Sequence, residues 1–278
     1  MLDSNILDQV RGIFANLDAQ YTFLTSIDNN REEAHEMIDF INDFASTSSH
    51  INVAHTEATA DKLEFSILKN DEHTGITFRG IPNGHEFTSL LLAILNADGK
   101  GKNLPDEAIA RRIKALKGNV KLQTYVSLTC TNCPDIVQAL NIMAIINPNI
   151  SHEMIDGALF QAEADAMKIQ AVPTVYANEK MLHVGRGTLG ELLEKLENEV
   201  GSIADDNFEP VIRHYDVIVV GGGPAGSSAA IYSARKGLKV AVVAENVGGQ
   251  VKIKTFDKLR HANVEIVNEI TFNNVTDI

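Results

Sequence analysis

The first 200 residues repeat one order of predicted helices and strands, and this repeat constrains the fold more than any other feature of the chain. In each half, the apolar pattern predicts a strand, a helix and a second strand, followed by a hairpin of two strands and a final helix. An offset of about 102 residues aligns residues 21–25 with residues 123–127. Two similar α/β units therefore follow one another along the chain.

The order of elements in each half is that of a thioredoxin fold, so we expect thioredoxin-like domains at residues 1–100 and 101–200. The expected helices span residues 4–16, 31–45, 86–96, 105–116, 133–146, 158–168 and 188–199. The expected strands span residues 21–27, 51–57, 63–69, 74–79, 120–128, 151–156, 173–177 and 180–185.

The only two cysteines, Cys130 and Cys133, lie between a predicted strand and a predicted helix of the second half. Unpaired N–H groups and the positive end of the helix dipole favour the thiolate at such a position, and a cysteine one turn further on can close a disulfide. A structural zinc site needs four ligands, and no second cysteine pair exists. We therefore favour a redox-active dithiol over a metal site or two unrelated core thiols. Residues 26–31 of the first half contain no thiol, so that half is expected to be redox-silent.

A proline supports the thioredoxin-like interpretation of the second half. Pro173 opens the predicted strand 173–177, about forty residues after the cysteines. A proline at this place in thioredoxin-like proteins has a cis peptide bond and faces the dithiol, whereas a proline that only begins a strand has no such role. Because the cysteine pair and the element order accompany it, we predict that the bond before Pro173 is cis.

The pattern changes after residue 200. Residues 201–212 are small and polar, which predicts a linker. An apolar strand at 214–220 then leads into a G-x-G-x-x-G motif, a helix at 227–236 and a second strand at 239–244. This context indicates a dinucleotide-binding unit rather than a glycine-rich turn of an ordinary α/β unit.

Each glycine of the motif has a physical reason to be a glycine. Gly221 permits the tight turn, Gly223 lets a pyrophosphate approach the backbone, and Gly226 allows close packing of helix and strand. The pyrophosphate would lie at the helix N-terminus, and Glu245 would accept a hydrogen bond from a ribose hydroxyl. The fold class predicted for the whole chain is therefore α/β, with two tandem thioredoxin-like folds before an incomplete Rossmann-type dinucleotide-binding unit at residues 213–278.

Composition limits the partners and the cellular location that we expect for the chain. A formal net charge of −13 argues against a nucleic-acid partner. No run of 18 apolar residues and no apolar N-terminal stretch is present, so we expect neither a membrane span nor a signal peptide. Two cysteines in a chain of this size suit a reducing compartment, so we expect a cytoplasmic protein.

Together these motifs resemble the flavoprotein F subunit of bacterial alkyl hydroperoxide reductase, with a match over about residues 1–250. The motifs that carry the resemblance are Cys-Thr-Asn-Cys-Pro at 130–134, Gly-Gly-Gly-Pro-Ala-Gly at 221–226, Gly-His-Glu-Phe-Thr-Ser at 84–89, Pro-Asp-Ile-Val-Gln-Ala-Leu-Asn at 134–141, Ala-Ile-Tyr-Ser-Ala-Arg-Lys-Gly at 230–237 and Gly-Gly-Gln at 248–250. The resemblance implies tandem thioredoxin-like domains and a module that binds FAD and NAD(P)H. It also implies electron flow from NADH through FAD and two cysteine pairs to the disulfide of a peroxiredoxin.

The resemblance also implies roles for individual residues. Cys130 would be the exposed nucleophile that attacks the disulfide of the partner, and Cys133 would resolve the mixed disulfide. Glu86 matches an acid that lies close to the dithiol and could act as an acid or base or tune the pKa of the thiols. Without the resemblance, Glu86 would be interpreted as an acid in the first turn of a helix, stabilised by the helix dipole. Cofactor-binding positions beyond the three motif glycines are Pro224, Ala225, Gly249 and Gln250.

The chain departs from the family pattern after residue 250. Family members are about twice as long, and the second cysteine pair, which would receive electrons from FAD, is missing here. Residues 251–267 resemble a helix and strand from deep in the pyridine-nucleotide domain. One strand–helix–strand half-unit and a 28-residue tail cannot enclose a flavin, so we do not expect this chain alone to form a complete FAD site. We therefore expect residues 210–278 to be a poorly stabilised remnant that could pair with another chain, such as a second copy in a homodimer, and we expect no NADH oxidation by this chain alone.

Two other functions remain open from the sequence. One is a general glutaredoxin-like or thioredoxin-like thiol–disulfide oxidoreductase with a vestigial flavin module. The other is a non-catalytic scaffold whose cysteine pair is incidental. The match at residues 84–89 and the tandem arrangement favour a peroxiredoxin reductase over the first, and the cysteine pair with Pro173 argues against the second.

Overall fold

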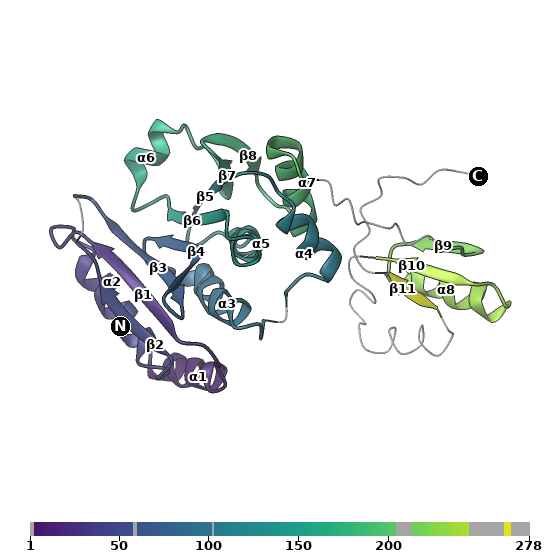
Figure 1. Ribbon diagram of the computed structural model, residues 1–278, viewed down its shortest axis with the longest axis horizontal. Coiled ribbons are helices and arrows are strands. Elements are labelled where there is room, and N and C mark those ends of the chain that lie inside the picture. The colour runs from purple at the N-terminus through teal and green to yellow at the C-terminus, as the bar shows by residue number, and fades with distance from the viewer. Residues whose placement is uncertain (1–2, 58–59, 102, 204–212, 245–263, 268–278) are drawn as a thin grey trace. The chain divides into compact units, whose positions relative to one another are not determined.

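The computed structural model describes residues 3–57, 60–101, 103–203, 213–244 and 264–267 (Figure 1). The chain divides into two compact units, residues 1–204 and residues 205–278.

The unit of residues 1–204 is built on one eight-stranded sheet with the order β2-β1-β3-β4-β6-β5-β7-β8. Its strands are β1 (Tyr21–Ile27), β2 (Ile51–His55), β3 (Leu63–Lys69), β4 (Glu72–Arg79), β5 (Val120–Val126), β6 (Ile150–Asp156), β7 (Thr174–Ala177) and β8 (Lys180–Val184). Its helices are α1 (Ser4–Phe14), α2 (Ala34–Ala45), the short 3-10 helix η1 (Gly84–Glu86), α3 (Phe87–Ala97), α4 (Glu107–Lys114), α5 (Cys133–Ile146), α6 (Gln161–Ala166) and α7 (Leu189–Val200).

Each half of this unit has the predicted order of a thioredoxin fold, and the two halves share their sheet. Strand β4, the last strand of the first half, pairs in parallel with β6 of the second half, with Ile76 opposite His152 and Phe78 opposite Met154. The two predicted domains are therefore not separate bodies, because one hydrogen-bonded sheet continues from one half into the other.

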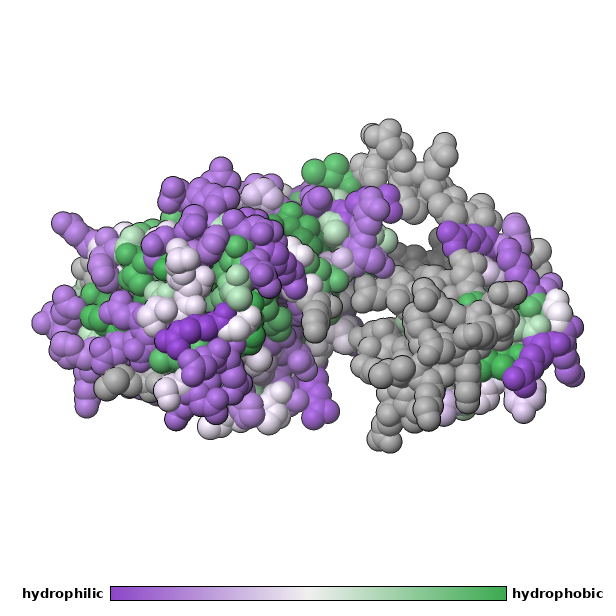
Figure 2. Space-filling model, turned by 90° about the horizontal axis from the view of Figure 1, so that it is seen from below, coloured by the Kyte–Doolittle hydropathy of each residue, from purple (hydrophilic) through white to green (hydrophobic). Residues whose placement is uncertain are grey.

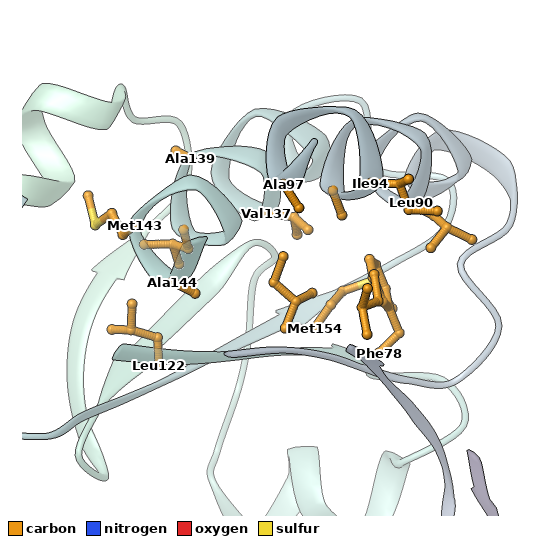
Figure 3. Close-up of a cluster of buried hydrophobic side chains, with 14 of the residues drawn as sticks. Phe78, Leu90, Ile94, Ala97, Leu122, Val137, Ala139, Met143, Ala144 and Met154 are labelled. Atoms are coloured by element: carbon orange, nitrogen blue, oxygen red, sulfur yellow. The ribbon is translucent and has the colours of Figure 1, made fainter. Parts of the chain in front are cut away.

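The shared core lies between this sheet and two helices. Figure 3 shows Leu90, Ile94 and Ala97 of α3 and Val137 and Met143 of α5 above three strand residues, Phe78, Leu122 and Met154. The helices meet the sheet here because both are largely apolar around their circumference, unlike the amphipathic α1 and α7 at the surface.

The strand alternation corrects the offset between the two halves. Buried residues of β1 and β5 alternate in the same phase when Tyr21 is matched with Val120, 99 residues further on, and α2 and α5 then also begin at matching positions, Ala34 and Cys133. The offset of about 102 suggested by residue type is wrong, because it differs from 99 by an odd number and would exchange the two faces of the strand. Structurally, Arg31 and Ala34 therefore occupy the places of Cys130 and Cys133.

The predicted elements of this unit are confirmed, with differences at their ends. The helix predicted at 158–168 is only Gln161–Ala166, since Lys168 adopts a positive φ of 55° that ends it. The linker predicted at 201–212 begins later, because Leu116 and Ser202 form a β-bridge and the Ile203 N–H donates to the Ala115 carbonyl. Residues 204–212 lie outside the described residues.

In the described residues of the second unit, one helix covers a small parallel sheet. Its order is β11-β10-β9, formed by β9 (Val217–Val220), β10 (Val240–Val243) and β11 (Glu265–Val267), and α8 (Pro224–Arg235) connects the first two strands (Figure 1). The apolar contacts between α8 and the sheet centre on Ala230 and Val242. This arrangement confirms the strand–helix–strand unit expected for a Rossmann-type fold, with a helix that begins at Pro224 rather than at residue 227.

The visible surface of the described residues is mostly hydrophilic, with scattered apolar patches (Figure 2). In the first unit, the large apolar side chains that are exposed come from different elements: Ile6 and Ile13 from α1, Met181 and Val184 from β8, and Ile203. Scattered apolar residues of this kind are ordinary for a protein surface. Among the helices that the structure describes, none combines the length and the apolar character that crossing a membrane requires.

Candidate functional site

Cys130 and Cys133 form a disulfide at the start of α5, with their Cα atoms 5.5 Å apart. Cys133 is the first residue of the helix and is completely buried, whereas Cys130 lies on the preceding turn and is half-buried. The two sulfur atoms are therefore unequal in their access to another molecule.

The helix terminus provides the electrostatic setting for these sulfurs. Pro134 occupies the first turn of α5, where its missing N–H costs no hydrogen bond. The free N–H groups of that turn and the helix dipole stabilise negative charge at the cysteines once the disulfide is reduced. Asn132, at the N-cap position, makes no side-chain cap to the helix.

The predicted cis bond before Pro173 is confirmed, because the Val172–Pro173 peptide is cis. The sulfur of Cys130 lies 3.8 Å from the carbonyl oxygen of Val172, the residue before this proline. Strand β7 begins directly after the proline and pairs with β5, the strand that leads to the cysteines. The paired strands thus bring Pro173 to the more exposed sulfur, 43 residues away along the chain.

Glu86 belongs to the first half but packs against the helix that carries the cysteines. It ends η1, which is held in place because the His85 N–H donates to the Leu128 carbonyl at 3.0 Å. Gly84 has a φ of +54°, and a side chain there would come within 2.6 Å of the Leu128 carbonyl oxygen. Only glycine therefore permits this close approach between η1 and the turn before the cysteines.

The Glu86 carboxyl is completely buried, and neither of its oxygens has a hydrogen-bond partner among the described residues. Burial raises its pKa to about 7; the nearby Ser89 hydroxyl acts in the opposite direction, and the Asp135 carboxylate in the first turn of α5 raises it further. Glu86 also stands in the first turn of η1 and at the N-cap of α3, the position that the sequence alone suggested, but it is buried there. The carboxyl can therefore hold or release a proton near neutral pH.

Arg186 is a residue at this site that the sequence did not indicate. Its Nε donates a 2.9 Å hydrogen bond to Oδ1 of Asn132, the second of the two residues between the cysteines. The two residues are 54 positions apart, and neither belongs to a motif whose spacing would connect them. The loop after β8 approaches α5, where a side chain at Gly187 would lie 3.3 Å from Ile136, and this approach brings the arginine to Asn132.

The glycine motif of the second unit has the geometry that a pyrophosphate needs. Gly221 has a φ of +107°, and a side chain at Gly226 would collide with the Gly221 carbonyl oxygen. Gly223 is the N-cap of α8, and a side chain there would meet open space. The helix therefore begins with bare backbone N–H groups at Ala225 and Gly226, which fits the pyrophosphate of FAD. The predicted Glu245, Gly249 and Gln250 lie outside the described residues.

Family models match two parts of the chain. Residues 120–198 match a thioredoxin domain, and residues 216–271 match an FAD-dependent oxidoreductase. The first match contains the disulfide and Pro173, and the second begins just before the glycine motif.

Curated relatives match most of the chain. It is 43% identical to a protein of Bacillus subtilis named NADH dehydrogenase and 41% identical to the alkyl hydroperoxide reductase F subunit of Pseudomonas aeruginosa, in each case over 90% of this chain and 48% of the relative. The chain thus spans about half the length of the curated relatives it matches.

A solved structure matches the first unit. The chain is 32% identical to the NTD_N/C domain of the alkyl hydroperoxide reductase AhpF from Enterococcus faecalis, with a TM-score of 0.64. The match covers 70% of this chain and all of that one.

Proposed function

Because this chain belongs to the family of bacterial alkyl hydroperoxide reductase F subunits, we propose that its Cys130–Cys133 pair passes electrons to the disulfide of a peroxiredoxin. The observation that carries the proposal is the unequal exposure of two bonded sulfurs at the start of α5, beside the cis Pro173. In this role the chain supports the removal of hydroperoxides, which the recharged peroxiredoxin reduces.

The reaction begins from the reduced dithiol. The thiolate of Cys130, the more exposed cysteine, attacks one sulfur of the partner's disulfide, so that a mixed disulfide forms and one partner thiolate leaves. The sulfur of Cys133 then attacks the Cys130 sulfur, the mixed disulfide breaks, and the second partner sulfur leaves as a thiolate that takes up a proton. The partner gains two electrons, and Cys130 and Cys133 return to the disulfide.

Glu86 is suited to the second of these steps. Cys133 must lose its thiol proton before it attacks, and it is completely buried. We propose that the carboxylate form of Glu86, which η1 holds against the turn before the cysteines, accepts this proton inside the protein. Its pKa of about 7 lies near that expected for a thiol at a helix N-terminus, which favours such a transfer. Pro173 would restrict access to the sulfurs from the side of β7 and align the partner's chain against it.

We assign the binding of FAD to the glycine motif of the second unit, through the free N–H groups of Ala225 and Gly226 and the backbone around Gly221, Gly223 and Pro224. When bound, FAD accepts a hydride from NAD(P)H and supplies electrons for disulfide reduction. Glu245, Gly249 and Gln250 would complete the cofactor contacts.

The domain division that we propose follows from these roles. Residues 1–100 form a redox-silent support, residues 101–200 carry the dithiol, and residues 213–278 contribute to the flavin unit. We further propose a cytoplasmic location, since a working dithiol suits a reducing compartment, and a homodimer as the assembly that completes the flavin unit.

The test is electron transfer from the prereduced chain. The chain is reduced with dithiothreitol, the reductant is removed, and oxidised peroxiredoxin from a bacterial alkyl hydroperoxide reductase is added. We expect one peroxiredoxin disulfide to be reduced per chain, measured by alkylation of the new thiols and mass spectrometry. No transfer, under conditions where dithiothreitol itself reduces the peroxiredoxin, would contradict the proposal. Equal rates with oxidised insulin would instead indicate a general thiol–disulfide oxidoreductase.

A further inference from the structure

Arg186 lies in the loop between β8 and α7, exposed at the edge of the dithiol site. Its only hydrogen bond among the described residues runs from Nε to Asn132 Oδ1, which leaves the two terminal NH₂ groups of the guanidinium for another molecule. This hydrogen bond places a permanent positive charge next to Asn132, which directly precedes Cys133.

Asn132 makes this contact in place of a helix cap. Asparagine is among the preferred N-cap residues because its side-chain oxygen can accept a hydrogen bond from the N–H of the second or third helical residue. Asn132 stands at the N-cap of α5, yet its side chain makes no cap, and its oxygen accepts from Arg186. The guanidinium and the cysteine turn are therefore tied directly to each other.

The loop that carries Arg186 is held firmly. The ammonium of Lys195 can only donate, so its 2.8 Å contact makes Nδ1 of His183 the acceptor. Nε2 of the same ring then carries the proton and donates to the carbonyls of Gly185 and Arg186, at 3.1 and 2.8 Å. A side chain at Gly187 would come within 2.8 Å of that Nε2 and 3.3 Å of Ile136 in α5. The loop thus lies close to both the imidazole and α5, and Arg186 is preorganised.

Arg186 differs from other arginines of this unit in having no acidic partner. Arg11, Arg31, Arg79 and Arg112 each pair with a carboxylate, whereas no carboxylate of the described residues pairs with Arg186. The acid nearest in sequence, Glu191, is engaged in the capping box of α7, where it accepts from the Thr188 N–H at 2.8 Å. The charge of Arg186 is therefore free to pair with a group of another molecule.

We propose that Arg186 recognises a carboxylate that flanks the disulfide of the protein substrate. This inference rests on the proposed function and adds the chemistry of the segment that docks. A planar guanidinium with two free NH₂ groups matches a carboxylate, and the preorganised loop lowers the entropic cost of the contact. In a chain with a net charge of −13, such a cation also offsets the general repulsion of an acidic segment.

The test uses two synthetic disulfides that differ only in charge. They are the disulfide-linked dimers of the peptides Ala-Asp-Cys-Asp-Ala and Ala-Asn-Cys-Asn-Ala, and each is mixed with the prereduced chain at low ionic strength. The measured quantity is the rate of reduction of the Asp peptide divided by that of the Asn peptide. We expect this ratio to fall about fivefold in Arg186→Gln, the effect of losing one exposed ion pair. In Arg11→Gln, the matched control, the same charge is lost from α1 and the ratio should not change.

The other possible results of this experiment also decide for or against the inference. Equal slowing of both peptides in Arg186→Gln, with an unchanged ratio, would overturn the inference and show that Arg186 only positions Asn132. An equal fall of the ratio in Arg11→Gln would overturn it as well, because net charge alone would then explain the effect. If the parent chain reduces neither peptide, this inference fails, whereas the proposed function is judged by electron transfer from the prereduced chain to peroxiredoxin. If the parent reduces both peptides and also transfers electrons to peroxiredoxin, an unchanged ratio in Arg186→Gln overturns this inference alone and leaves the proposed function standing.

Discussion

The two halves of the first unit share one fold and close the same turn by different chemistry. In the second half, the turn between β5 and α5 is closed by the disulfide, and Cys130 contacts the carbonyl before Pro173. In the first half, the carboxylate of Asp28 accepts hydrogen bonds from the N–H groups of Asn30 and Asp61, both at 3.0 Å, which lower its pKa. Backbone hydrogen bonds can therefore hold this turn, and the fold itself does not require the dithiol.

In the first half, the silent half, which contains no cysteine, Arg31 stands at the place of Cys130. Arg31 donates to the carbonyls of Asp61 and Leu159, at 3.1 and 3.0 Å, and its guanidinium lies 5.0 Å from the centroid of the Phe160 ring. Leu159 and Phe160 belong to the second half. The site that carries the nucleophile in one half thus serves as a structural tie between the halves in the other.

The silent half also contributes Glu86, the buried acid beside α5. The comparison therefore separates two tasks. One half presents the sulfur atoms, and the other supplies an ionisable group and the β4 edge of the shared sheet. Four experiments test this division of tasks between the two halves, and the effects expected from them decrease in the order given.

The largest effect is expected from Phe78→Ala in the silent half. Phe78 is completely buried, stacks on Phe65 with ring centroids 5.3 Å apart, and lies on the strand that pairs with β6. We expect a loss of about 3–5 kcal/mol in the free energy of unfolding, with faster hydrogen exchange in both halves. Faster exchange only in residues 1–100 would contradict the shared core. Val184→Ala, at an exposed position, is the control and should change stability by less than about 0.5 kcal/mol.

Acidification should destabilise the dithiol half through His152. This ring is buried between Thr124 and Asn141, at 2.9 and 2.7 Å, and burial lowers its pKa to about 3. In the unfolded chain it takes up a proton near pH 6.5, so the unfolded state binds more protons between pH 6.5 and 3 and stability falls as the pH falls. The loss is about 1.4 kcal/mol per pH unit.

The measurement is urea denaturation from pH 7 to pH 4.5, compared between the parent and His152→Gln. Glu86 acts in the opposite direction between pH 4.5 and 7, so the difference between the two proteins is the relevant quantity. Equal pH slopes in the two proteins would contradict the role of His152. The matching position of the silent half is Val53, which does not titrate.

Glu86→Gln should stabilise the protein at high pH and slow its reaction. The Glu86 pKa is about 7 when folded and near 4.5 when unfolded, so the unfolded state loses its proton first and stability falls as the pH rises through this window. We expect the variant to gain roughly 1–3 kcal/mol more at pH 8 than at pH 4.5, and to release the reduced partner more slowly. Glu72→Gln, at an exposed position, should do neither. A pH-independent effect on stability would contradict the buried carboxylate.

The smallest effect is expected from Arg31→Ala. It removes two hydrogen bonds to carbonyls and the contact with Phe160, so we expect a loss of about 1 kcal/mol in urea denaturation. The rate of peroxiredoxin reduction should not change. A slower rate at unchanged stability would show that the silent half acts on the chemistry through this residue.

The sequence predicted the elements well because each has a local cause. The alternation of β1, the cysteine pair before α5 and the proline before β7 are all visible within a few residues. The pairing of β4 with β6 has no local signal, since either strand could form the edge of its own half. The offset of the repeat followed residue type instead of the buried face of the strand, and so was three residues too long.

Prediction of the site from the sequence was likewise limited to features with a local signal. Cys130, Cys133 and Pro173 are brought together as their motifs indicate. The burial of Glu86 depends on the close approach of Gly84 to Leu128, which lies 44 residues further along. The contact of Arg186 with Asn132 depends on a loop held by His183 and Lys195. Contacts of this kind arise from packing between distant segments, which one sequence does not reveal.

The roles of Cys130 as the nucleophile and Cys133 as the resolving thiol are tested most directly by trapping the mixed disulfide with peroxiredoxin. Prereduced Cys133→Ser is mixed with oxidised peroxiredoxin, and the products are separated without reductant and identified by mass spectrometry. If Cys130 is the nucleophile and Cys133 the resolving thiol, the variant accumulates one covalent adduct through Cys130, and Cys130→Ser accumulates none. An adduct through Cys133 in the Cys130→Ser variant, or no adduct in either, would contradict the roles assigned to the exposed and buried sulfurs.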